Sequence, residues 1–296
     1  MAFEGQAYSV GEILAAAKLN QMDANIDLVR NNHVGSSAPA ELAAGVMWID
    51  NTTAAAWVLK VYDGAAWITL GVINSTANTA MAGMMNVQTF TASGTYTPTP
   101  GMLNCLVEMV GGGGGSGGNP STSSNQTCAA GGGGGGGYAR ELLSASDIGA
   151  SQVVTIGAGG AGGAAGQNNG SSGGTTSLGA LLTATGGGGG NAMAATSSGA
   201  TNSANGGSPG SGSGGDISIY GSGGGNSYAD GVNESWGGYG GASFFSGTRR
   251  SLSAASVASA GRDYGGGAAG PSSNQNDAAR AGEAGADGFI IITEYF

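Results

Sequence analysis

Aromatic and charged side chains in the second half of the chain are concentrated between residues 220 and 264. This stretch holds seven of the eight aromatic residues that occur between positions 111 and 270. Aromatic and arginine side chains dominate recognition surfaces because they bury large areas at a low entropic cost. We therefore expect loops over 226–264 to bind a partner. The expected contacts are Tyr228, Trp236, Tyr239, Phe244, Phe245, Arg249 and Arg250.

An alternative role for the same aromatic residues is to fill gaps in a core that has few other side chains. The residues between the aromatics are mostly Gly, Ala, Ser, Asn and Thr, which leave little bulk for packing. The sequence favours contact with a partner most for Tyr228, Tyr239 and the two arginines.

The sequence contains few of the residues and motifs that catalysis requires. Glycoside hydrolysis needs two carboxyl groups held about 5–10 Å apart, and the candidates Asp230, Glu234 and Asp263 are sparse. A single histidine in the chain argues against a metal site or a catalytic triad. The glycine strings at 111–118 and 157–163 lack the helix, acidic residue and GK[ST] motif of nucleotide loops. We expect neither enzyme activity nor a cofactor or metal.

The charge and hydropathy of the chain limit the classes of partner that it could bind. The net charge is −10, and lysine occurs only at positions 18 and 60, which argues against nucleic acid and anionic membrane surfaces. No run of 18 apolar residues is present, and the first residues lack the pattern of a secretory signal, so we expect no membrane insertion. Cys105 and Cys128 could pair if they were adjacent, but two separate thiols are favoured.

Glycine dominates the middle of the chain, with 52 of the 64 glycines between residues 111 and 270. Only 9% of residues are charged, too few to keep a disordered chain solvated. The runs lack the three-residue repeat and proline content of collagen, and their alternation with apolar segments is unlike a linker. We expect packed polyproline-II segments, in which glycine lets neighbouring backbones approach closely and hydrogen-bond.

Two regions precede the glycine runs, and a third contains them. Residues 9–33 predict a helix with a heptad-spaced apolar stripe, which indicates oligomerisation through Leu19, Met22, Ile26 and Val29. Residues 36–86 predict a small β module, with strands at 46–50, 56–63 and 66–70, an Asp63–Gly64 turn, and a connector over 72–86. We place the domain boundaries at 1–35, 36–86 and 87–296.

The third region predicts a mainly β domain. Its expected strands are short and alternate with the glycine runs, which is typical of a β-sandwich or jelly-roll-like frame. The expected strands lie at 87–96, 102–110, 138–142, 152–156, 175–178, 181–185, 217–220 and 289–295.

The order of strands and glycine runs resembles a known family. The residues that carry the resemblance are 95–115 (TYTPTPGMLNCLVEMVGGGGG), 131–142, 153–160, 174–187 and 285–295 (GADGFIIITEY). They are similar to the glycine-rich domain of bacteriophage tail fibres and tail-fibre adhesins, over about 87–296. Residues 59–67 (LKVYDGAAW) are similar, less specifically, to the virion-proximal modules of short phage fibres.

The resemblance implies a homotrimer in the virion. Its N-terminal segment would join a phage tail or baseplate protein, and loops at the far end of the glycine-rich domain would bind a host surface protein or glycan. The alternatives are a structural virion spike or decoration without receptor binding and, less favoured, a polysaccharide depolymerase.

Overall fold

The computed structural model describes residues 33–40, 44–54, 56–76, 79–81, 85–232, 234–250 and 255–296. They divide into two compact units. The first takes in the described residues up to Asn86 with Thr99–Leu103 and Glu294–Phe296, and the second consists of Val87–Pro98 and Asn104–Thr293. The predicted N-terminal helix with Leu19, Met22, Ile26 and Val29 lies outside the described residues, except that its last position, His33, begins a strand.

The mainly β character of the chain is confirmed. Within the described ranges the one helix is α2 (Ala145–Ile148), a single turn. Ser144 caps it by accepting the N–H of Asp147, whose carboxylate in turn accepts the N–H of Ser144. The strands form several small sheets and no closed barrel.

The first unit contains one five-stranded sheet, and its strands neighbour one another in chain order. The strands are β1 (His33–Gly35), β2 (Met47–Asp50), β3 (Trp57–Tyr62), β4 (Trp67–Asn74) and β5 (Thr79–Met81). The predicted Asp63–Gly64 turn joins β3 to β4. The Asp63 carboxylate accepts the N–H groups of Ala65 and Ala66 at 2.7 Å each, and Gly64 takes a φ of +105°.

Two expectations for this unit were wrong. The predicted connector over 72–86 instead contains the end of β4, the whole of β5 and the start of β6. His33, expected at the end of a helix, pairs with Trp48 in a parallel bridge between β1 and β2. Both errors have the same cause, since short strands of weak local pattern form only when a neighbouring strand supplies their hydrogen bonds.

The second unit contains two further five-stranded sheets. One has the order β16-β10-β8-β20-β6 and the other β15-β13-β12-β11-β7, and β12 and β13 lie against β8 and β10. Val107, Met109, Leu178, Leu182 and Ile290 are completely buried here. The strands are β6 (Met85–Phe90), β7 (Gly94–Tyr96), β8 (Asn104–Val110), β10 (Tyr138–Ser144), β11 (Gln152–Thr155), β12 (Thr176–Leu178), β13 (Leu182–Ala184), β15 (Gly212–Ser213), β16 (Ile217–Ile219) and β20 (Phe289–Tyr295).

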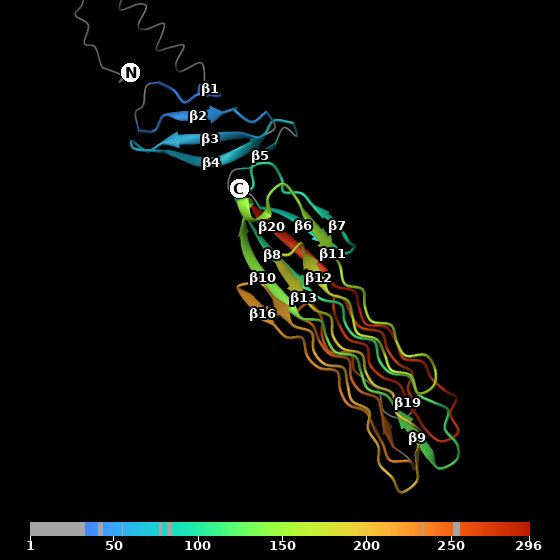
Figure 1. The fold of residues 1–296 in the computed structure, drawn as a ribbon. Coiled ribbons are helices and arrows are strands. Elements are labelled where there is room, and N and C mark those ends of the chain that lie inside the picture. The colour runs from blue at the N-terminus through green and yellow to red at the C-terminus, as the bar shows by residue number, and fades with distance from the viewer. Residues whose placement is uncertain are drawn as a thin grey trace, which may run out of the picture. The chain divides into compact units, whose positions relative to one another are not determined.

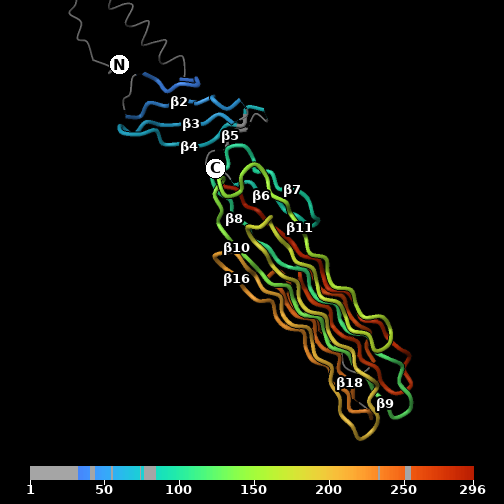
Figure 2. The backbone as a smooth tube through the Cα atoms, viewed as in Figure 1, coloured from blue at the N-terminus to red at the C-terminus, as the bar shows by residue number. Residues whose placement is uncertain are grey.

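Extended glycine-rich segments continue from these strands and run side by side along the second unit (Figure 1). In Figure 2 the same segments form a bundle of parallel tubes that ends in a group of loops. We call the end with β8, β10 and β20 the sheet end, and the end with β9 (Gln126–Ala129) and β19 (Ser272–Ser273) the loop end.

The segment 111–119 shows how the bundle is held together. Its N–H groups donate in a repeat of three: the set beginning at Gly111 bonds to 131–137, the set beginning at Gly112 to 168–174, and the set beginning at Gly113 to 280–286. Its carbonyl groups accept from three other segments, 160–166, 187–190 and Ala268. A repeat of three is that of a polyproline-II helix, which makes no hydrogen bonds within itself. The neighbouring segments therefore satisfy the buried backbone.

Glycine is required in this bundle by space. A Cβ atom added at Gly113, Gly133 or Gly135 would lie far closer than 3.0 Å to a carbonyl oxygen of the neighbouring segment. Real Cβ atoms essentially never approach another atom so closely. The absence of side chains is therefore what allows the segments to lie at hydrogen-bonding distance on every side.

Candidate binding surface

The structure divides the seven predicted contact residues between different parts of the bundle. Tyr228 and Trp236 lie at the loop end, in strands that pack on β9. Phe244 and Phe245 pack on Tyr138, the first residue of β10, at the sheet end. The remaining three, Tyr239, Arg249 and Arg250, belong to the segments between these two groups.

Tyr228 and Trp236 face each other across a small hairpin. They are opposite residues of β17 (Tyr228–Ala229) and β18 (Ser235–Trp236), and their side chains are 42% and 54% exposed. The other opposite pair, Ala229 and Ser235, is buried. Because side chains alternate between the faces of a strand, the hairpin presents its two aromatic rings outward. We call Tyr228 and Trp236 the aromatic pair.

The turn of this hairpin is fixed by local chemistry. The Asp230 carboxylate accepts the N–H groups of Val232 at 2.8 Å and Glu234 at 2.9 Å, an Asx-type arrangement that closes the loop. Gly231 has a φ of +74° and donates its N–H to Thr127 Oγ1 at 2.8 Å. A Cβ at Gly231 would collide with the carbonyl group of Ser197, so the turn also needs glycine for its close approach.

The hairpin rests on a small core of its own. Cys128, Ala129, Met193, Ala204 and Ala229 form a buried cluster beneath it. Burial raises the pKa of the Cys128 thiol to about 12. Cys105 is also buried, but in β8, and no disulfide joins the two, as the sequence favoured.

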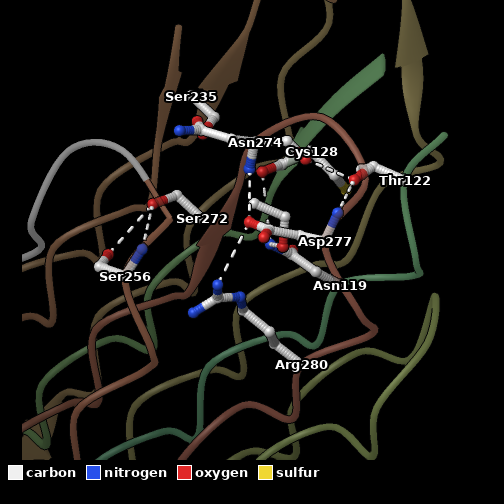
Figure 3. Close-up of polar contacts among 10 residues, drawn as sticks. Asn119, Thr122, Cys128, Ser235, Ser256, Ser272, Asn274, Asp277 and Arg280 are labelled. Atoms are coloured by element: carbon white, nitrogen blue, oxygen red, sulfur yellow. Dashed lines mark hydrogen bonds and ion pairs between the residues drawn. The ribbon is translucent and has the colours of Figure 1, made fainter. Parts of the chain in front are cut away.

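A network of polar side chains connects two segments at the loop end (Figure 3). The Asp277 carboxylate accepts the N–H of Asn274 at 2.8 Å and pairs with Arg280 at 3.2 Å. Thr122 Oγ1 accepts the N–H of Asp277 at 3.0 Å and donates to the carbonyl oxygen of Asn274. Side chains thus reinforce the backbone hydrogen bonds that join 119–122 to 277–280.

Sequence reasoning missed this network. The run Pro271-Ser-Ser-Asn-Gln-Asn-Asp277 carries strong turn signals, since Asn, Asp and Ser side chains readily accept backbone N–H groups. Those signals could have identified a loop, but nothing in them indicated that Thr122, 155 positions before Asp277, would be its partner.

One buried side chain in the network, that of Asn119, has hydrogen-bond partners for only one of its two polar atoms. Asn119 is fully buried, and its Nδ2 donates to the carbonyl oxygen of Cys128 at 3.4 Å and to Ser273 Oγ at 3.3 Å. Its Oδ1 has no hydrogen-bond partner among the described residues.

Tyr239 lies beside the bundle, with its ring over Gly225. A Cβ at Gly225 would meet the Tyr239 ring closer than 3.0 Å, and the Gly225 N–H donates to the Tyr239 carbonyl oxygen at 2.8 Å. The ring remains 51% exposed. Next to it, Gly240 and Arg249 exchange backbone hydrogen bonds, which leaves Arg249 half-buried and Arg250 exposed.

The aromatic residues at the sheet end pack on one another. Phe244 stacks on Tyr138 with ring centroids 4.0 Å apart, Phe245 meets Phe289 edge-on at 5.9 Å, and Tyr264 stacks on Phe289 at 4.0 Å. The Tyr138 hydroxyl donates to Glu108 at 2.6 Å, and burial together with this carboxylate raises the pKa of Tyr138. Phe245 is half-buried among these rings, whereas Phe244 remains 55% exposed.

Metal-binding clusters and membrane-spanning helices are both absent from the described part of the chain. Within it, no three His, Cys, Asp or Glu side chains converge on a position that could hold a metal ion. No helix there has the length and apolar character required to cross a bilayer.

Comparison with known proteins gives one family. A family model described as a glycine-rich domain matches residues 88–295, which is more than two thirds of the chain. A search of curated proteins finds no match. The matched range spans the strands of both ends and all the glycine segments between them, so the chain belongs to the glycine-rich domain family.

Proposed function

We propose that this chain is a homotrimeric bacteriophage tail fibre located in the virion. Its residues 1–35 attach to a protein of the tail or baseplate, and the loop end of the glycine-rich domain binds a protein or glycan on the host surface. The family match supports the glycine-rich part of this proposal. The residue pattern resembling phage fibres supports the remainder.

The observation that carries the proposal is the exposed aromatic pair on a firmly held hairpin. Tyr228 and Trp236 project from strands whose inner residues are buried, and whose turn is fixed by Asp230 and Gly231. Rigid, amphipathic rings bind at a low entropic cost because few torsions must be frozen. We include Tyr239, Arg249 and Arg250 in the proposed surface.

Phe244 and Phe245 fit the proposed surface less well. Both belong to the aromatic packing at the sheet end, where Phe245 is only partly exposed and Phe244 is 55% exposed. We assign Phe245 to packing within the bundle, and Phe244 remains a predicted contact at the sheet end, separate from the aromatic pair.

The glycine bundle suits this role because it is stiff and because most of its side chains are small. Each central segment is hydrogen-bonded on all sides, so bending the bundle would break backbone bonds in several neighbours at once. A stacked polyproline-II bundle can therefore hold a few bulky side chains in fixed positions on its surface.

The test uses the phage that carries this chain and its plating host. Immunogold labelling should place the chain on the tail, and purified full-length chain should block phage adsorption. The double variant Tyr228→Ala/Trp236→Ala should lose at least about tenfold in blocking potency, since central aromatic contacts at interfaces are each worth about 2 kcal/mol or more.

The matched control is Tyr220→Ala. Tyr220 is 72% exposed and follows β16 at the sheet end, so its loss removes an exposed ring away from the proposed surface. Unchanged blocking by the double variant would refute the assignment of the aromatic pair. Label on the tail with no blocking by the wild-type chain would favour a structural spike, and release of reducing sugar from host polysaccharide would favour a depolymerase.

A further inference from the structure

The aromatic pair lies between two segments that are polar but uncharged. On one side, Asn202 and Ala229 exchange backbone hydrogen bonds at 3.0 Å each, which brings the exposed segment 197–203 beside β17. On the other side, β18 contacts β19, and the chain continues from β19 into 274–276. The side chains of both segments offer hydroxyl and amide groups without any charge (SSGATNS over 197–203 and SSNQN over 272–276). Hydrogen-bond donors and acceptors therefore flank the two rings.

The apolar area that the aromatic pair exposes is small. Both side chains are about half exposed, and an aromatic side chain can bury about 150–250 Å², so the two together offer roughly 200 Å². A protein partner covers about 800 Å² on each side of a specific interface and fills the centre of that interface with apolar and aromatic groups. Two rings in a polar surround therefore fit a small polyhydroxylated ligand better than a protein surface.

The charge close to the aromatic pair is negative. Glu234 lies two positions before Trp236 and is exposed like it, and Ser235 between them is buried, so both side chains point away from the buried side of the hairpin. The hairpin and its two flanking segments contain no lysine or arginine. An acidic ligand would therefore meet like charge without a compensating base.

We propose that the aromatic pair binds a neutral saccharide. A pyranose ring carries C–H groups on one face, and these pack on the negative π-face of an aromatic ring. Its hydroxyl groups donate to and accept from the flanking hydroxyl and amide side chains, while the Glu234 carboxylate accepts hydroxyl protons and repels acidic sugars. This inference rests on the proposed function and deepens it, because it selects a glycan over a protein as the ligand of the loop end.

The first test measures binding of the full-length chain to immobilised saccharides. The probes are neutral oligomers of glucose, galactose, mannose and N-acetylglucosamine, the same backbones carrying uronate or sulfate, and polysaccharide extracted from the plating host and freed of protein. Tyr228→Ala and Trp236→Ala should each weaken binding to a neutral probe at least about tenfold. Trp236→Phe keeps an aromatic face and should retain most of the binding, and Tyr220→Ala, at the sheet end, should leave it unchanged.

The second test concerns the selection against acidic sugars. Glu234→Gln removes the charge and keeps the shape, so the preference for a neutral probe over its acidic counterpart should fall about two- to fivefold, the range of an exposed charge interaction. Binding to none of the probes, or binding that both alanine variants retain, would overturn the proposal. A stronger affinity of the wild-type chain for acidic probes would do the same.

The third test separates this inference from the proposed function. Labelled chain is added to host cells treated with protease, which removes surface proteins, or with periodate, which cleaves the vicinal diols of sugars. Binding should survive protease and fall at least tenfold after periodate. Binding that protease abolishes and periodate spares would contradict the saccharide site and leave host attachment in place. Binding to a neutral probe through the aromatic pair, without any staining of untreated host cells, would count against the proposed function alone.

Discussion

Alanine substitution at two adjacent glycines provides the sharpest test of the bundle. A Cβ at Gly224 would lie 2.7 Å from the carbonyl carbon of Gly132 and closer still to its oxygen. At Gly223 the nearest atoms are 3.5 and 3.9 Å away, an ordinary contact, and the φ of neither glycine is in the left-handed region. The two positions thus share a segment and a composition and differ in the space available.

The expected magnitude follows from the hydrogen bonds of this segment. Relieving the clash at Gly224 requires a shift of roughly 1 Å, since carbon atoms pack at about 3.5–4.0 Å. The Gly224 N–H donates to Gly207 O at 2.9 Å and Gly225 to Tyr239 O at 2.8 Å, and such a shift would lengthen these bonds beyond useful range. Losing two bonds at about 0.5–1.5 kcal/mol each, with overpacking of about 1–3 kcal/mol, gives a destabilisation of roughly 2–6 kcal/mol.

Gly223→Ala should instead stabilise the protein by about 0.4–1 kcal/mol, because alanine restricts the unfolded chain and costs nothing in the folded one. At about 2–4 °C per kcal/mol for a domain of this size, the two variants should differ in Tm by roughly 5–30 °C. Differential scanning calorimetry of the full chain measures this difference. Equal Tm values, or a higher Tm for Gly224→Ala, would show that the glycines are not required by close backbone packing.

Two further predictions concern ionisable groups. Hydrogen bonds from Lys60 and Thr52 lower the pKa of Asp50 to about 2, so its stabilising contribution is present above the unfolded value of about 3.9 and is lost as the pH falls towards about 2. Lys60→Met should move the Asp50 pKa upward in an NMR titration, and an unchanged pKa would show that Lys60 is not its cause. Burial raises the pKa of the Cys128 thiol to about 12, so a thiol reagent at a pH of about 8 should react only after denaturant is added; rapid labelling of the folded chain would contradict the buried position.

The sequence suggested one aromatic surface, whereas the structure has separate aromatic groups at the loop end and the sheet end. This difference has a geometric cause. Trp236 and Phe244 are close in sequence, which suggested a single surface over 226–264. An extended segment advances about 3.1 Å per residue, so about eight residues span about 25 Å and carry the chain from one end of the bundle towards the other. Residues that are near in sequence therefore lie far apart, while Phe245 meets Phe289 through a contact that only the folded chain creates.

What the sequence by itself determined is local: the strands bordering the glycine runs, the Asp63–Gly64 turn, and the need for backbones to approach closely where side chains are missing. The tertiary structure decided which glycine segments are neighbours and in which register, as in the bonding of Gly111 to the run 131–137 and of Gly112 to the run 168–174. The physical reason is that glycine has no side chain with which to encode a partner. Its pairing is set by backbone hydrogen bonds that are alike at every position, and the side chains at the two ends of the bundle must fix the alignment.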